Sequence, residues 1–307
     1  MIAHLARAAL LAAALLASAA PAQAASAALR FCDRGPSMTA TEQDRLLRFA
    51  ALVKEELDGA GDAVALVSRS GLNLQRFGLR YSHAGIGLKP AGDGAAGWAV
   101  RQLYYACSEG RPRLYDQGLA GFVSGTENPA TGYISIVLLP KALAEPLAAA
   151  ARDNALALSL LAGRYSANAF PFSLRYQNCN QWVMELIAAA WGRTGGSGLQ
   201  ARERAQAWLQ AQDYDPEPVR VDSHLLMFAS AFVPWVHADD HPEEDWFKLQ
   251  VRTSVPREIE AFVRRRAPAA RRVELCHDER RVVVRHGWQP LGDGCEPQAG
   301  DRVVPLD

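Results

Sequence analysis

The stretch that decides the fold is YQNCNQWV, residues 176–183, in which Cys179 stands among amides directly before an apolar stripe. The stripe continues at helical spacing as far as Trp191, and Gly192 ends it. This pattern predicts a buried helix over residues 179–191 that begins at the cysteine. Because the free N–H groups and the dipole at a helix N-terminus favour a thiolate, we expect a lowered pKa for Cys179. The same N–H groups are suited to the oxyanion formed when sulfur attacks a carbonyl.

A second stretch, YSHAGIGL at residues 81–88, places His83 at the entry of a predicted strand with small or apolar neighbours. A histidine on a rigid strand can present its ring to a cleft, and near neutral pH it can act as base and then as acid. The plain structural alternatives are a small buried residue at a helix start and a hydrogen-bonded strand histidine. A thiol nucleophile needs a base, and a histidine base needs a group to deprotonate. The pair therefore favours thiol chemistry with Cys179 as nucleophile and His83 as base.

The rest of the chain mixes short strands with amphipathic helices. A capping box at residues 41–44 opens a predicted helix that Gly59 ends. Further helices are expected over 142–161 and 201–210, and strands over 64–67, 82–88, 99–106 and 133–139.

The first 24 residues have a short basic start, a run of Ala and Leu, and a small-x-small ending at Ala24. These features predict a secretory signal peptide cleaved near Ala24, and therefore a periplasmic or secreted protein. Cys32 lacks the small residues that precede a lipidated cysteine, so no lipid anchor is expected.

The composition narrows the classes of partner. It is 49% hydrophobic, as in an ordinary globular protein, and removing Arg7 with the signal leaves 32 of the 33 basic residues against 33 acidic ones. This balance argues against nucleic acid or an anionic membrane as the main partner. No later stretch is apolar for long enough to span a membrane. No glycine-rich phosphate loop and no zinc spacing of cysteines occurs, so no cofactor and no metal are expected.

All five cysteines lie beyond the predicted signal, where disulfides can form. Because five is odd, at least one thiol is left over. Cys276 and Cys295 flank a predicted hairpin and could be bridged, and Cys32 with Cys107 would complete the pairing. Spacing leaves the connectivity open, including a bridge from Cys179 to Cys32 or Cys107.

Prolines and short elements mark the sequence after residue 214. We expect a main domain over 25–214 and a C-terminal extension over 215–307 packed on it, with a small second domain as the alternative. Residues 237–245 hold His237, His241 and five carboxylates, which raises a metal site as one interpretation. Flanking prolines disfavour a helix there, so a solvated loop is the simpler expectation.

Two short motifs resemble the circularly permuted branch of the NlpC/P60 superfamily, which includes lecithin retinol acyltransferase-like proteins. They are SHAGI at residues 82–86 and NCNQWV at 178–183. The resemblance covers roughly residues 60–192 and implies a papain-like α+β fold, an antiparallel sheet packed with helices, and thiol chemistry on an amide, ester or acyl group.

The chain as a whole is also similar to DUF2145, a family of uncharacterised exported bacterial proteins, which brings no known activity. The likeness spans most of the chain beyond the signal, and its motifs are RYSHAG at 80–85, RQLYY at 101–105, YSANA at 165–169 and YQNCNQW at 176–182.

Sites that resemble this one usually add a polar residue on the strand after the histidine strand, where it orients the imidazole. Gln102, on the next predicted strand, is our choice, and Asp116 is the second. A glutamine can orient a ring, although it cannot stabilise imidazolium with a charge.

Two classes of function therefore remain. The first is an exported thiol hydrolase or acyltransferase whose substrate is a peptidoglycan peptide or a lipid acyl group of the cell envelope. The second is a non-catalytic envelope binding or assembly protein that keeps the fold. An accessible Cys179 of low pKa would support the first class, and a buried or disulfide-bonded one would support the second.

Overall fold

The computed structural model describes residues 38–90, 97–195 and 199–306, so the predicted signal peptide and Cys32 lie outside the described residues. The fold and the site described below belong to one compact unit, which takes in residues 35–105 and 111–307. No helix in the described ranges combines the length and the apolar character that a membrane span needs.

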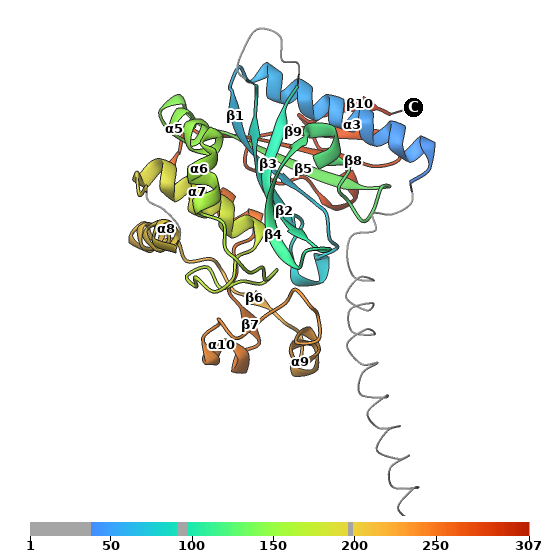
Figure 1. Cartoon of the computed structure of the whole chain (residues 1–307). Coiled ribbons are helices and arrows are strands. Elements are labelled where there is room, and N and C mark those ends of the chain that lie inside the picture. Colours follow the sequence, from blue (N-terminus) through green and yellow to red (C-terminus); the bar gives the residue numbers. More distant parts are fainter. Residues whose placement is uncertain (1–37, 91–96, 196–198, 307) are drawn as a thin grey trace, which may run out of the picture. The chain divides into compact units, whose positions relative to one another are not determined.

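The unit is built on a large sheet that runs, within the described residues, in the order β10-β9-β8-β5-β1-β2-β3-β4 (Figure 1). Antiparallel ladders join β1 to β2 and β5, β5 to β8, and β9 to β8 and β10. The strands are β1 (Val64–Arg69), β2 (His83–Leu88), β3 (Ala99–Ala106), β4 (Arg111–Gly118), β5 (Gly132–Leu138), β8 (Arg271–His277), β9 (Arg281–His286) and β10 (Arg302–Pro305). The expected α+β class with an antiparallel sheet packed by helices is confirmed.

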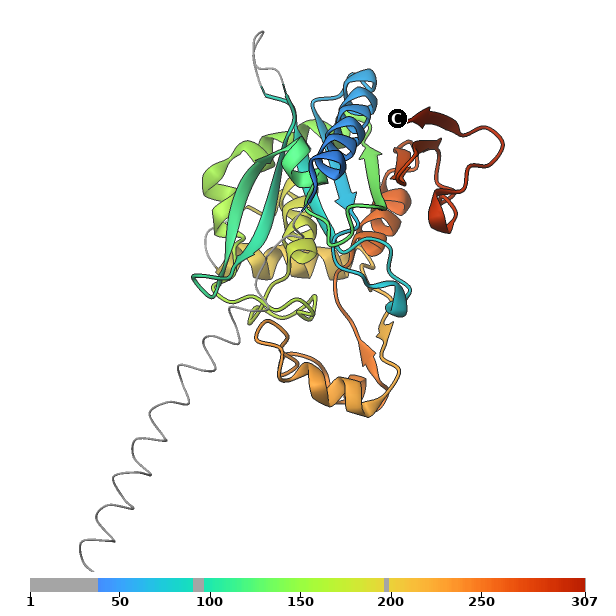
Figure 2. The same cartoon turned by 90° about the vertical axis from the view of Figure 1, so that its right-hand side faces the viewer.

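Helices cover both faces of the sheet because successive strand residues point to opposite sides. On β1, Val64 and Leu66 belong to one buried cluster, and Ala65 and Val67 belong to another. The first cluster includes side chains of α5 (Lys141–Arg152), α6 (Asn154–Ser159), α7 (Cys179–Gly192), α8 (Leu199–Ala211) and α11 (Pro256–Arg266), and the second includes those of α3 (Ala40–Gly59) and α4 (Leu119–Val123). Figure 2 shows the blue α3 and the green and yellow helices on either side of the sheet.

Several element boundaries differ from the sequence expectation. The capping box is formed by Thr39 and Glu42 instead of residues 41–44, since the Thr39 hydroxyl accepts from the Glu42 N–H and the Glu42 carboxylate accepts from the Thr39 N–H. The helix expected over 142–161 is broken into α5 and α6, because the Asp153 side chain caps a new N-terminus through the N–H groups of Ala155 and Leu156. β4 is not predicted from the sequence, because its arginines obscure the alternation of apolar and polar residues that is typical of a strand.

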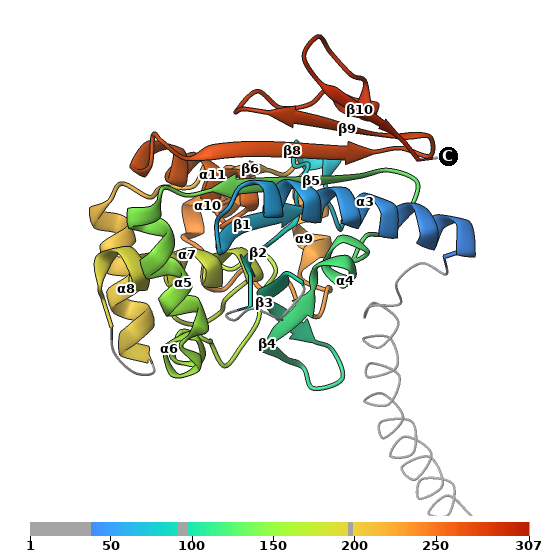
Figure 3. The ribbon, with the colours of Figure 1, turned by 90° about the horizontal axis from the view of Figure 1, so that it is seen from above.

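The sequence after residue 214 contributes to the main sheet. β8, β9 and β10 extend it beyond β5, as the view from above in Figure 3 shows. Between α8 and α11 lie the short α9 (His224–Ser230) and α10 (Glu243–Phe247), with a two-stranded ladder of β6 (Val219–Arg220) and β7 (Gln250–Val251). The domain boundary expected near residue 214 stays a prediction.

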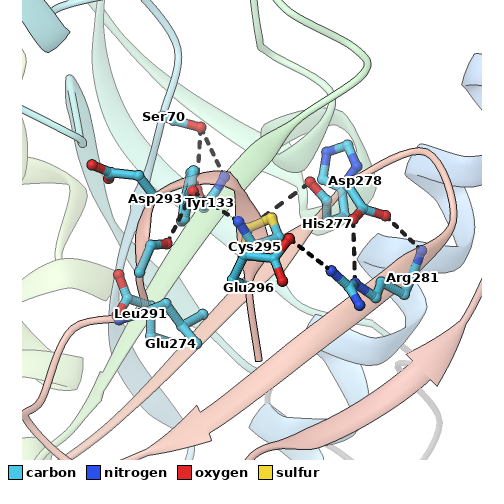
Figure 4. Close-up of a disulfide and its surroundings, with 12 residues drawn as sticks. Ser70, Tyr133, Glu274, His277, Asp278, Arg281, Leu291, Asp293, Cys295 and Glu296 are labelled. Atoms are coloured by element: carbon cyan, nitrogen blue, oxygen red, sulfur yellow. Dashed lines mark hydrogen bonds and ion pairs between the residues drawn. A yellow bond between two sulfur atoms is a disulfide. The ribbon is translucent and has the colours of Figure 1, made fainter. Parts of the chain in front are cut away.

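A disulfide joins Cys276 on β8 to Cys295, with a Cα–Cα distance of 5.6 Å and a sequence separation of 19. This bridge confirms the expected pairing of Cys276 with Cys295. Figure 4 shows Cys295 beside Tyr133, whose hydroxyl accepts from the Cys295 N–H at 3.4 Å. Cys107 is also disulfide-bonded, while its expected partner Cys32 lies outside the described residues. Cys179 is a free, buried thiol.

Candidate functional site

Cys179 is the first residue of α7, and the segment before it is fixed in place. The Asn178 side chain caps the helix by accepting from the Gln181 N–H at 2.7 Å. Its amide donates at 2.8 Å to the Thr253 hydroxyl and at 3.1 Å to the Ser254 carbonyl. An Asn cap whose amide is itself anchored holds the start of the helix in one orientation, and with it the sulfur.

The sulfur of Cys179 lies against backbone N–H groups. Those of Cys179, Asn180 and Ala84 interact with it and favour its negative form. Burial acts in the opposite direction and is the larger effect, so it raises the pKa of Cys179 to about 11. The expected low pKa is therefore wrong, because a residue that is only 7% exposed loses more from desolvation than it gains from the helix N-terminus.

His83 is the first residue of β2, and its ring is held by a chain of amides. Its Nε2 lies 2.5 Å from Oε1 of Gln102, and the Gln102 amide nitrogen donates to Oε1 of Gln117 at 2.7 Å. Because an amide oxygen only accepts, this contact places the ring proton on Nε2 and leaves Nδ1 as a base. Burial, with a smaller contribution from the charge of Arg69, lowers the pKa of His83 to about 3. The ring is neutral at physiological pH.

Backbone contacts bring Cys179 and His83 into one neighbourhood. The β2–β3 ladder runs from Ile86↔Arg101 to Leu88↔Ala99, and on the His83 side of it the Ala84 N–H faces the sulfur. Within the described residues, no hydrogen bond joins the sulfur to the ring. The sulfur therefore lies at the backbone of Ala84, whereas the ring of His83 lies against Phe122 of the second cluster.

The second choice for the orienting residue, Asp116, lies elsewhere. Its two carboxylate oxygens accept from Nε and Nη2 of Arg101, each at 2.6 Å, and it is half-exposed. Its neighbour Gln117, one residue on, is the one that reaches Gln102. The structure thus places Gln102, and not Asp116, at the ring.

Sequence reasoning missed Arg69, the last residue of β1. It stands directly opposite His83 in the β1–β2 ladder and is 9% exposed. Its Cζ lies 5.4 Å from the centroid of the Phe122 ring, which in turn lies 5.9 Å from the His83 ring. No motif marks this arginine, since its place follows from strand register.

A buried polar network supports the helix behind the site. Glu185, six residues after Cys179 on α7, accepts from Nε and Nη2 of Arg202, each at 2.9 Å. It also accepts from the amides of Gln177 at 2.6 Å and Gln206 at 2.8 Å. Since Gln177 lies in the segment that leads to Cys179, this network fixes the approach to α7.

Residues 237–245 differ from the expected solvated loop. The last three, Glu243, Glu244 and Asp245, form the first turn of α10, so Pro242 precedes a helix there. The side chains of Asp240 and His241 are 1% and 3% exposed. Asp240 accepts from the Phe170 N–H at 3.1 Å, and His241 Nε2 lies 2.7 Å from the Asn168 carbonyl oxygen. These contacts bind the loop to residues 168–170. Among the residues that the structure describes, no group of three or more His, Cys, Asp or Glu is arranged to hold a metal ion.

A cavity of about 600 Å³ lies away from this chemistry. It is lined by α3 and by β8 and β9, with Glu56, Arg271, His286 and Trp288 among its residues. None of the residues near Cys179 lines it, so it gives no support to either functional class.

No curated protein and no solved structure matches the chain. Residues 56–263 match a family model described as an uncharacterized protein conserved in bacteria, DUF2145. The matched region covers more than half of the chain and contains the β2 histidine, the β3 glutamine and the α7 cysteine. The chain belongs to the DUF2145 family of bacterial proteins.

Proposed function

We propose that this protein is an exported thiol hydrolase or acyltransferase that acts on an amide or an ester. Cys179 is the nucleophile, His83 the base and Gln102 the residue that orients the ring. The observation that carries the proposal is the joint placement of a free thiol against three backbone N–H groups and of a neutral imidazole whose Nδ1 is left as acceptor.

The reaction follows from these groups. His83 Nδ1 takes the thiol proton while the sulfur bonds to the acyl carbon, and the carbonyl electron pair moves to oxygen. The N–H groups at the start of α7 and of Ala84 stabilise that oxyanion. When it collapses, the bond to the amine or alcohol breaks, and His83 returns the proton to this leaving group. Water, or an acceptor amine or alcohol, then releases the acyl group from sulfur by the reverse steps.

The order of the parts supports a papain-like fold of the permuted NlpC/P60 type as a proposal. A histidine strand precedes the cysteine helix, and α7 packs against β2 through Ala84 and Ile86. The predicted signal peptide favours a substrate of the cell envelope, a peptidoglycan peptide before a lipid acyl group.

Acylation by p-nitrophenyl acetate tests the proposal. The folded, non-reduced protein should release one equivalent of nitrophenolate in a burst and gain one acetyl group on Cys179, read by mass spectrometry after proteolysis. The variants His83→Ala and Cys179→Ala should lose the burst. The proposal fails if wild type and His83→Ala acylate at the same rate, or if the urea-unfolded chain acylates faster than the folded protein.

A non-catalytic envelope protein is the second candidate, and the surroundings of Cys179 favour it. Cys179 is buried with a raised pKa, and the described residues show no hydrogen bond from its sulfur to His83. In that case Cys179→Ala would leave both the fold and the binding of envelope fragments unchanged.

A further inference from the structure

Arg69 is a buried cation beside the candidate site, and its position is set by the sheet. It pairs with His83 across the antiparallel β1–β2 ladder, so the two side chains lie on the same face with Cβ atoms about 5 Å apart. Both contact the Phe122 ring, Arg69 by its guanidinium and His83 by its imidazole. The guanidinium and the imidazole therefore share one wall of the site.

Two glycines leave space for the Arg69 guanidinium. A Cβ atom at Gly71 would lie 2.5 Å from Nη1 of Arg69, and one at Gly125 would lie 2.8 Å from both Cζ and Nη2. Any other residue at either position would push the guanidinium aside. The backbone thus leaves room for this charge at one defined place.

A fixed positive charge in a poorly solvated site affects its neighbours in opposite ways. It disfavours a second positive charge on His83 and favours a negative one on Cys179. After burial, Arg69 is the next largest influence on both groups, and it lowers both pKa values. Tyr104 on β3, another ionisable side chain, lies edge-on at 6.3 Å from the His83 ring.

We propose that Arg69 is a positioning residue of the site: its charge disfavours a second positive charge on His83, and it stabilises negative charge on Cys179 and on the oxyanion formed beside it. The catalytic role of Arg69 rests on the proposed function. Its influence on the protonation of His83 and Cys179 can be measured without any substrate.

The first test is an NMR titration of the His83 ring in Cys179→Ser protein, with the signal assigned by its loss in His83→Gln. Arg69→Met removes the charge and should raise the protonation midpoint of the ring by about one pH unit. Arg69→Lys should retain most of the wild-type value. The control is Arg48→Met, which removes an exposed arginine on α3 and should change nothing. Identical His83 midpoints in Cys179→Ser protein with and without Arg69→Met would overturn the inference.

The second test is alkylation of Cys179 by iodoacetamide at a fixed alkaline pH. Arg69→Met should slow it about tenfold, the equivalent of one pKa unit. Gly125→Ala keeps the charge and displaces the guanidinium, so it should shift both readouts in the same direction, and it decides the matter if Arg69→Met does not fold. If the His83 midpoint and the alkylation rate change as expected while ester turnover is absent, the proposed function fails and the role of Arg69 stands. If ester turnover is present and neither variant changes either readout, the role of Arg69 fails and the proposed function stands.

Discussion

Removing the Cys276–Cys295 disulfide should destabilise the protein by about 3 kcal/mol through chain entropy alone. The bridge closes a loop with a sequence separation of 19, and a cross-link of that span restricts the unfolded chain by this amount. Both cysteines are fully buried in a small cluster with Tyr81, Tyr133 and Leu291. Because the double variant Cys276→Ala/Cys295→Ala also loses packing there, we expect a total cost of about 4 kcal/mol.

Urea unfolding followed by circular dichroism measures this cost. The matched control is Val283→Ala, which trims the same cluster directly opposite Cys276 and keeps the cross-link. It should cost about 1–2 kcal/mol with an unchanged m-value. The double variant should show a larger m-value, since its unfolded chain exposes more surface. A double variant that loses no more stability than Val283→Ala, at equal m-value, would refute the reasoning.

Three further predictions concern single side chains. Gln102→Glu places a carboxylate at the ring and should raise the pKa of His83, as followed by NMR titration; an unchanged midpoint would contradict the contact. Acidification should lower stability, because burial lowers the pKa of His277 to about 4 and the unfolded state alone binds its proton between about pH 6.5 and that value. The cost is roughly 1.4 kcal/mol per pH unit. His277→Leu should remove this part of the pH dependence measured by urea unfolding, and the equal part that comes from His83 should remain. Glu185→Leu should cost about 3–5 kcal/mol by leaving the Arg202 guanidinium buried and unpaired, whereas the double variant Glu185→Leu/Arg202→Leu should unfold in urea closer to wild type.

Local sequence could predict those parts of the site that depend on helix capping and on the apolar pattern of a single helix or strand. The start of α7 at Cys179 followed from a polar segment ahead of an apolar stripe, and the strand that carries His83 followed from small and apolar neighbours. The choice of Gln102 also needed the resemblance to NlpC/P60 proteins, which implies a polar residue on the strand after the histidine strand, and the structure places Gln102 at the imidazole. Thr39 could have been found as well, since it stands three residues before Glu42.

Other parts depend on contacts between residues far apart in the chain. Arg69 lies opposite His83 only because of the register between β1 and β2. β8 pairs with β5 across more than a hundred residues, a partnership that no local pattern indicates. The pKa of Cys179 also depends on such packing, because burial in the assembled core outweighs the helix N-terminus.

A thiol with a pKa of about 11 beside a ring with a pKa of about 3 limits how the proposed chemistry can begin. Forming a free thiolate at neutral pH would cost about 5 kcal/mol, so a standing thiolate–imidazolium pair is not the reactive state. The proton must instead pass to His83 Nδ1 as the sulfur attacks, which the neutral ring permits at any pH above its own pKa. If a standing thiolate reacted, the rate of acylation would keep rising with pH towards the thiol pKa. If His83 assists, the rate of acylation would reach a plateau at a pH well below the thiol pKa, and His83→Ala would lose that plateau.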